Sequence, residues 1–205
     1  DVYGPWVTHW EIWNEPDWVS NWQVTLNWTT QPPAASELPR FNGSIHDYIR
    51  MLRIAWEVKE RVAPQTFIAV GGLGYSSFLD AILRYTDNPT DGSVTADYPL
   101  RGGAYFETLS FHYYPHFSPG NSDAAAQGIL NSKAQYQTVL DAHDAGPKRW
   151  IATEAGAASQ VLADTPSGPE YARNFILKGM TKAHADGVSA IHWFVLSNGG
   201  HSQDA

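Results

Sequence analysis

Short apolar segments recur along the chain at intervals that suit strands separated by helices. They are rich in β-branched and aromatic residues and lie between turn-forming residues, which is the pattern of buried β-strands. The predicted strands are residues 6–13, 67–70, 108–114, 150–153 and 190–196. Since these segments are apolar on both faces, we expect a parallel sheet covered by helices.

Amphipathic helical patterns separate the predicted strands. The clearest begins at Ser44, has Asp47 at the spacing of a capping box, and stops near Pro64. Its apolar stripe consists of Ile45, Ile49, Leu52, Trp56 and Val62. Further helices are predicted over residues 78–85, 124–145 and 169–185. We expect Gly146 and Gly187 to follow the last two directly, where a left-handed residue is favoured.

The regular alternation of strands and helices predicts an α/β fold, either a doubly wound sheet or a (β/α)8 barrel. A dinucleotide-binding sheet would carry a G-x-G-x-x-G turn, but the glycine-rich segment at residues 71–74 lacks that spacing. Polar residues suited to catalysis instead follow the C-terminal ends of several strands, which is typical of the barrel. We therefore predict a single, incomplete barrel domain over residues 1–205.

Two long connections interrupt this alternation. The first, residues 16–43, carries Trp18, Trp22 and Trp28 among polar residues. It is either a substrate-binding loop or a cover that packs on itself. The second, residues 87–103, follows a helix, so we place it on the opposite side of the barrel and expect structural roles there.

Composition and charge narrow the class of partner. The formal net charge is -8 and the basic residues are scattered, which argues against nucleic acid or an anionic membrane surface as a partner. No apolar run approaches the roughly 18 residues of a membrane span. The chain has no cysteine, which excludes disulfides and thiolate metal sites. Aromatic residues make up 13% of the chain, so those left over from core packing suit the stacking of sugar rings.

Two glutamates lie at the ends of predicted strands. Glu15 ends the first strand in Trp-Asn-Glu-Pro, and Glu154 ends the fourth in Ile-Ala-Thr-Glu-Ala-Gly. In a parallel barrel both project from one face, whatever their separation in sequence. Hydrolysis of a glycosidic bond needs one carboxylic acid that protonates the leaving oxygen and one carboxylate that attacks the anomeric carbon or activates water. Charge repulsion would keep one member of such a pair protonated.

The neighbouring residues Asn14 and Glu15 would point to opposite faces of a regular strand. Both can reach a substrate only if the strand twists or bulges at its end. Pro16 favours such a break, because proline cannot continue a central ladder. On the predicted third strand, His112 and Tyr114 share one face.

At these positions the sequence resembles the clan A glycoside hydrolases, in which Asn-Glu-Pro ends strand 4 and a second glutamate ends strand 7. The matching residues are Asn14, Glu15, Pro16, His112, Tyr114, Glu154 and Trp193. Residues 11–17 are most similar to the family of β-xylosidases and α-L-iduronidases, with cellulase-like families close behind. Ala155 departs from the β-xylosidase pattern, which usually has a tryptophan there. The resemblance implies strands 4 to 8 of a (β/α)8 TIM barrel, without strands 1 to 3.

The resemblance also implies a retaining glycosidase acting on a polysaccharide or oligosaccharide. Glu15 would be the acid/base and Glu154 the nucleophile that forms a covalent glycosyl-enzyme. Asn14 would bind the 2-hydroxyl of the sugar, and Tyr114 would donate a hydrogen bond to Glu154. The expected substrate-binding residues are Asn14, His112, Tyr114, Trp193 and, from the first long loop, Trp18. No cofactor is implied.

Three alternatives stay open at this point. A non-catalytic carbohydrate-binding barrel would keep the fold and the aromatic residues without needing both glutamates. A transglycosylase would share the covalent intermediate and differ in the acceptor. Metal-assisted hydrolysis would use His112 with His116, but the residues between them run from strand to loop, so the rings need not converge and we expect no metal.

A chain that lacks strands 1 to 3 would leave strand edges unpaired and apolar faces in contact with water. We therefore expect self-association and doubtful activity if these residues are made alone. The sequence does not decide the compartment, although the sequons at residues 27–29 and 42–44 would accept glycans in a secreted parent protein.

Overall fold

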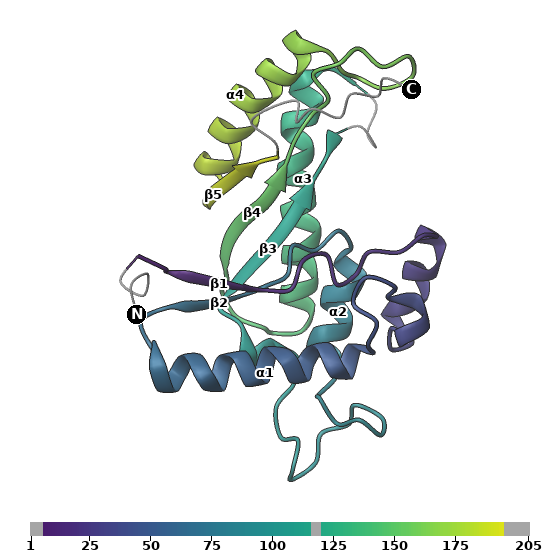
Figure 1. Cartoon of the computed structure of the whole chain (residues 1–205), viewed down its shortest axis with the longest axis vertical. Coiled ribbons are helices and arrows are strands. Elements are labelled where there is room, and N and C mark those ends of the chain that lie inside the picture. Colours follow the sequence, from purple (N-terminus) through teal and green to yellow (C-terminus); the bar gives the residue numbers. More distant parts are fainter. Residues whose placement is uncertain (1–5, 116–119, 195–205) are drawn as a thin grey trace, which may run out of the picture. The chain divides into compact units, whose positions relative to one another are not determined.

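The computed structural model describes residues 6–115 and 120–194, which contain five strands with helices between them (Figure 1). The strands are β1 (His9–Ile12), β2 (Phe67–Val70), β3 (Thr108–Tyr113), β4 (Arg149–Ala155) and β5 (Val188–Trp193). They form one sheet in the order β1-β2-β3-β4-β5, and the pairs β1–β2, β2–β3 and β4–β5 are parallel. Sequential order with helical connections is the arrangement of a (β/α)8 barrel, so the predicted partial barrel is confirmed.

The helices also lie where the apolar periodicity predicted them. They are α1 (Ile45–Val62), α2 (Ser76–Arg84), α3 (Ser122–Ala142) and α4 (Pro169–Ala185), with short 3-10 helices η1 (Trp22–Thr29), η2 (Ala35–Glu37) and η3 (Gly102–Tyr105). Gly187 follows α4 as predicted, with a φ of 84°. The prediction for Gly146 is wrong: its φ is 69°, but α3 ends at Ala142 and Asp144 is the first left-handed residue after it.

The capping box at the start of α1 is present as the sequence predicted. The Asp47 carboxylate accepts hydrogen bonds from the Ser44 amide at 2.8 Å and from the Ser44 hydroxyl at 2.7 Å. These hydrogen bonds lower the pKa of Asp47, the one from the Ser44 hydroxyl most of all. Helix α1 contacts β1 and β2, with Ile45, Ile49 and Leu52 of the predicted stripe buried, whereas Val62 is exposed, so the prediction for Val62 is wrong. The buried residues of this part include Ile45, Tyr48, Ile49, Leu52, Ile68 and Val70.

The chain divides into two compact units. The first unit comprises Asp1–Phe111 and Gln135–Arg149, and the second comprises His112–Ala134 and Trp150–Ala205. In the second unit Phe175 of α4 packs against Tyr113, with ring centroids 6.1 Å apart, and against Trp193 at 5.6 Å. Lys133 of α3 and Asp186 after α4 form an ion pair at 2.8 Å. Within that unit, these contacts hold α4 against Tyr113 and Trp193, and they hold the segment after α4 against Lys133.

In the first long connection, residues 16–43, one tryptophan packs in the core and two are exposed. Trp28 is buried, donates to Glu37 at 3.2 Å, and packs edge-on against Tyr75 and Phe78. It is therefore a core residue. Trp18 and Trp22 are 37% and 58% exposed. Only these two of the three tryptophans are placed to meet a ligand.

The second long connection has the structural role predicted for it. Asp87 is buried and forms an ion pair with Arg53 of α1 at 3.0 Å. His46 of α1 hydrogen-bonds the Thr86 carbonyl at 3.2 Å. Part of this connection, with residues 143 and 145, lines a hollow of about 410 Å³ that includes none of the expected site residues.

Several large apolar side chains of the first unit face water. They include Trp10 at 45%, Ile54 at 51%, Val58 at 40% and Val62 at 67% exposure. Exposed apolar surface of this kind favours association, so self-association stays a prediction that light scattering can check. Among the described residues, none of the helices has the length and apolar character needed to cross a membrane.

Candidate active site

The segment after β1 turns sharply and carries Glu15. The strand ends at Ile12, so Glu15 lies three residues beyond it rather than at its end, and the predicted strand boundary is corrected accordingly. Trp13 and Glu15 both have left-handed backbones, with φ of 73° and 46°. Such conformations cost non-glycine residues roughly 1–3 kcal/mol each and cluster at functional sites. The break that Asn14 and Glu15 need in order to reach one substrate is therefore present, directly before Pro16.

Hydrogen bonds to the loop after β2 fix this turn. The Tyr48 hydroxyl donates to the Ile12 carbonyl at 3.1 Å and accepts from the Gly71 amide at 2.8 Å. A Cβ on Gly71 would lie 2.7 Å from the Trp13 carbonyl oxygen, so only glycine fits the approach of the two segments. The sequence did not reveal the role of Tyr48, because its position indicated only a helix core residue.

Glu11 and Asp17, the acidic residues on either side of Glu15 in the sequence, have structural contacts. Glu11 accepts from the Gly72 amide at 3.1 Å and from the Ser110 hydroxyl at 2.9 Å. Asp17 is 1% exposed, and its Oδ2 accepts from two successive backbone amides, those of Gly74 at 2.9 Å and Tyr75 at 2.7 Å. Both carboxylates tie the β1 segment to neighbouring strands and loops.

The Glu15 carboxylate has a partner that the sequence did not predict. The Arg40 guanidinium forms an ion pair with Glu15 Oε2. The same guanidinium lies over the Trp18 ring, 4.4 Å from its centroid. A cation beside a carboxylate favours the ionised form. No motif signals this contact, since Arg40 lies in a loop 25 residues after Glu15.

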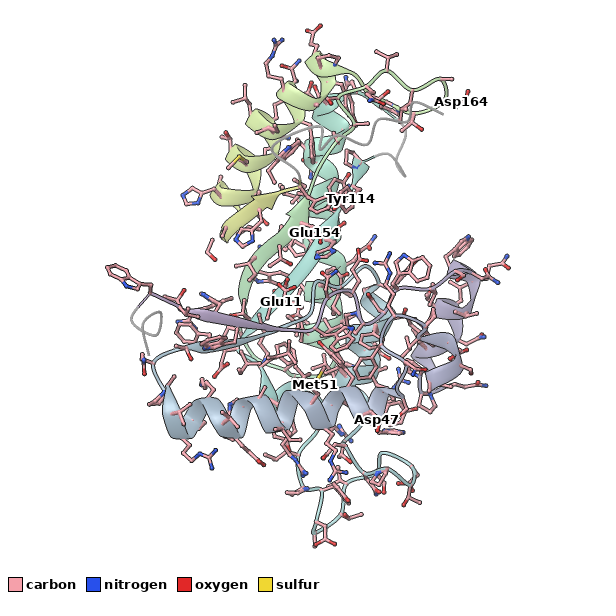
Figure 2. All side chains as sticks on the ribbon, in the orientation of Figure 1. Glu11, Asp47, Met51, Tyr114, Glu154 and Asp164 are labelled. Carbon is pink, nitrogen blue, oxygen red and sulfur yellow. The ribbon has the colours of Figure 1, made fainter. Side chains whose placement is uncertain are left out.

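The second unit holds Glu154 next to two of the expected site residues. The Tyr114 hydroxyl donates to Glu154 Oε2 at 2.5 Å, and His112 Nδ1 lies 3.6 Å from the same oxygen. Figure 2 shows Tyr114 and Glu154 together at β3 and β4. Burial, followed by the hydrogen bond to Glu154, raises the pKa of Tyr114, so the phenol stays a neutral donor. The expected hydrogen bond from Tyr114 is confirmed.

Trp193 and the next residue, Phe194, have different aromatic partners. The Trp193 ring packs on Phe175 of α4, so it contacts the helix that covers the sheet. The Phe194 ring instead meets Tyr114 edge-on at 6.5 Å and is 54% exposed. Phe194 is therefore an aromatic neighbour of the Tyr114–Glu154 pair that the resemblance did not name. The substrate role of Trp193 stays a prediction.

The expected residues thus fall into two groups. The first unit carries Asn14, which is exposed, together with Glu15 and Trp18, and the second carries His112, Tyr114, Glu154 and Trp193. His116, the partner considered for a metal with His112, lies outside the described residues.

No protein-family model matches the sequence, and no curated protein matches it. Solved structures do match the fold. A glycoside hydrolase family 17 β-1,3-glucanosyltransferase from Rhizomucor miehei has a TM-score of 0.53 and 15% identity, over 77% of this chain and 49% of that protein. A glucosidase from Croceicoccus marinus has a TM-score of 0.57 and 14% identity, over 91% of this chain and 32% of that protein.

An α-L-arabinofuranosidase from Thermotoga maritima has a TM-score of 0.51 and 11% identity, over 76% of this chain and 31% of that protein. The chain therefore spans half or less of the length of these enzymes. At such low identities the likeness concerns the fold alone: this chain has the strand and helix arrangement of part of a (β/α)8 barrel, and the solved structures that share it are glycoside-acting enzymes.

Proposed function

We propose that this chain is the catalytic part of a retaining glycoside hydrolase, with Glu154 as nucleophile and Glu15 as acid/base. The observation that carries the proposal is the position of the two glutamates: Glu15 follows β1, and Glu154 lies near the end of β4, in the same sheet. In barrel enzymes, catalytic residues come from the C-terminal ends of different strands. Two carboxylates in such positions match the requirement of glycoside hydrolysis.

In the first step, the Glu154 carboxylate attacks the anomeric carbon while Glu15 gives its proton to the leaving oxygen. The glycosidic bond breaks and an ester forms between Glu154 and the sugar. Tyr114 supports this role, because its hydroxyl fixes Oε2 of Glu154 at 2.5 Å and thereby orients the carboxylate toward the sugar. The nearby His112 adds a second contact on the same oxygen.

In the second step, Glu15 takes a proton from water, whose oxygen attacks the anomeric carbon. The ester bond breaks, Glu154 regains its carboxylate, and the sugar leaves with its original anomeric configuration. Asn14 would hold the 2-hydroxyl, and Trp18 would be an aromatic neighbour of the sugar rings. Trp193, whose ring packs on Phe175 of α4, would reach the sugar only with its remaining surface. A sugar acceptor in place of water would give transglycosylation through the same intermediate.

We further propose that the active protein contains the three strands that precede β1 in a complete barrel. Support comes from the lengths of the matched enzymes, of which this chain spans half or less. The apolar surface of α1 that faces water, at Ile54, Val58 and Val62, is where a preceding helix would pack in such a barrel. Activity measurements therefore belong on the full-length protein.

Product stereochemistry tests the proposed function. Proton NMR of the first-formed product, with a panel of aryl glycosides, should show the anomeric configuration of the substrate. Initial formation of the opposite anomer would contradict the double displacement, because inverting enzymes let water attack directly. A chelator should leave the rate unchanged. If hydrolysis were metal-assisted, the chelator would abolish activity. Binding of sugars with no turnover of any glycoside would favour the non-catalytic barrel.

A further inference from the structure

Arg40 contacts Glu15 but has no role in the mechanism proposed above. Its guanidinium forms an ion pair with Glu15 Oε2 and lies over the Trp18 ring, 4.4 Å from the centroid. The side chains of Arg40 and Glu15 are 46% and 20% exposed. The Arg40 guanidinium and the Glu15 carboxylate therefore meet where both side chains are partly exposed to water.

The loop that carries Arg40 is well fixed for this purpose. Phe41, the next residue, packs edge-on against Trp13 and Tyr48, with ring centroids 5.5 Å apart in both pairs. Tyr48 in turn holds the end of β1 through its hydroxyl. The backbone of Arg40 and the turn that carries Glu15 are therefore anchored to the same aromatic cluster.

Trp18 restricts the guanidinium itself. A guanidinium over an indole face gains about 0.5–1 kcal/mol at exposed sites, and its long side chain loses part of its freedom in advance. Trp18 is on the Glu15 side of the long connection, three residues after the carboxylate. The stack on Trp18 therefore holds the Arg40 guanidinium in position to pair with the Glu15 carboxylate.

We infer that Arg40 is a positioning residue that holds Glu15 as the carboxylate for the second, base-catalysed step of the reaction. The inference rests on the proposed function of Glu15. A neighbouring cation stabilises the carboxylate, which is the form that accepts a proton from water. In that step the O–H bond of water breaks toward Glu15, a bond forms from its oxygen to the anomeric carbon, and the ester bond to Glu154 breaks. Arg40 itself exchanges no proton.

The same contact opposes the first step, in which Glu15 must carry a proton. When Glu15 is protonated, the charge of Arg40's partner is lost and the ion pair becomes a weaker contact, while the stack on Trp18 is unaffected. The two steps therefore respond differently to removal of Arg40. A residue that merely supports the fold would affect both steps alike.

The test is steady-state kinetics of Arg40→Ala in the full-length protein with dinitrophenyl glycosides. Their leaving group needs no proton, so the second step limits kcat. We expect kcat to fall about threefold to tenfold, the effect of losing one exposed charge-assisted contact. The value of kcat/KM, which reports the first step, should stay within about twofold. Azide, a nucleophile that needs no base, should restore kcat.

Two further variants make the inference specific. Arg40→Lys keeps the positive charge and should retain most of kcat, while Arg61→Ala removes an exposed arginine of α1 and should change nothing. In the Glu15→Gln background, Arg40→Ala should cause no additional loss. An equal additional loss in that background, or a parallel fall of kcat and kcat/KM, would overturn the inference. Full activity of Glu15→Gln on all substrates would instead refute the proposed function.

Discussion

The two proposed catalytic carboxylates have partners of different kinds. Glu15 in the first unit faces a cation, Arg40, which reaches it from an exposed loop and rests on Trp18. Glu154 in the second unit accepts from a neutral phenol, Tyr114, which follows the neighbouring strand. Burial and this hydrogen bond raise the pKa of Tyr114, so its contact does not change with pH near neutrality.

This difference matches the different tasks of an acid/base and a nucleophile. A nucleophile must be ionised and oriented at the start of each cycle, and a constant neutral donor provides that. An acid/base changes its charge twice in each cycle. A solvent-exposed cation that can strengthen or weaken its contact suits that second task. The mutations below test whether the two carboxylates really differ in this way.

Glu154→Gln should have the largest effect, because an amide cannot form the covalent intermediate. We expect a loss greater than the roughly 10²–10⁴-fold that general acid–base catalysis supplies, with every substrate including dinitrophenyl glycosides. Initial rates with activated and unactivated substrates measure it. Residual turnover that depends on the leaving group would show that Glu154 is not the nucleophile.

Glu15→Gln should affect substrates unequally. Those whose leaving group needs protonation should lose about 10²–10⁴-fold in kcat/KM, while dinitrophenyl glycosides should keep most of theirs. A plot of kcat/KM against leaving-group pKa should become steeper than in the unmodified protein. If this variant and Glu154→Gln show the same dependence, the separation of roles is wrong.

Tyr114→Phe removes the donor to Glu154 and keeps the ring. Hydrogen bonds to charged groups contribute about 1.5–3 kcal/mol, so kcat/KM should fall about tenfold to a hundredfold for all leaving groups. The control is Tyr113→Phe, since Tyr113 packs on Phe175 of α4. An unchanged rate for Tyr114→Phe would mean that the 2.5 Å hydrogen bond does not serve catalysis.

Asp17→Ala tests the support of the turn that carries Glu15. The substitution removes the carboxylate to which the amides of Gly74 and Tyr75 donate. Asp17 is 1% exposed. We expect a loss of about 2 kcal/mol in the free energy of unfolding, measured with urea. Asp97→Ala, at an exposed loop position, is the matched control and should change stability by less than about 0.5 kcal/mol.

Asp47→Asn should have the smallest effect, and that effect should depend on pH. The pKa of Asp47 is lowered in the folded chain, by the Ser44 hydroxyl most of all, so its charge stabilises the fold above the ordinary carboxyl pKa. The contribution is lost as pH falls through the lowered folded pKa. At neutral pH we expect a loss of about 0.5 kcal/mol, from the charge at the helix N-terminus. Equal losses in urea titrations at neutral pH and near pH 2 would contradict this assignment.

The sequence predicted those features that depend on periodicity and on short spacings. The helix from Ile45 shows its apolar stripe and capping box directly. The hydrogen bond between Tyr114 and Glu154 was expected from the resemblance to clan A glycoside hydrolases, which assigns both positions to the site. The break at Glu15 followed from Pro16 and from the need for two adjacent side chains to act on one side.

Other features depend on the path of the chain between elements, which periodicity does not describe. Arg40 meets Glu15 because a long loop folds back on Trp18, and no local pattern encodes that return. Phe194 rather than Trp193 meets the Tyr114 ring, while Trp193 packs on Phe175 of α4. The sequence did not show which of these two adjacent aromatic residues would contact Tyr114.

Covalent trapping tests the central claim most directly. The full-length protein would be incubated with 2-fluoro dinitrophenyl glycosides, digested, and analysed by mass spectrometry. Fluorine at carbon 2 slows both steps, and the activated leaving group lets the covalent intermediate accumulate. We expect the mass of one fluorosugar on the peptide that contains Glu154, and no adduct in Glu154→Gln. An adduct on Glu15 or another residue would contradict the account.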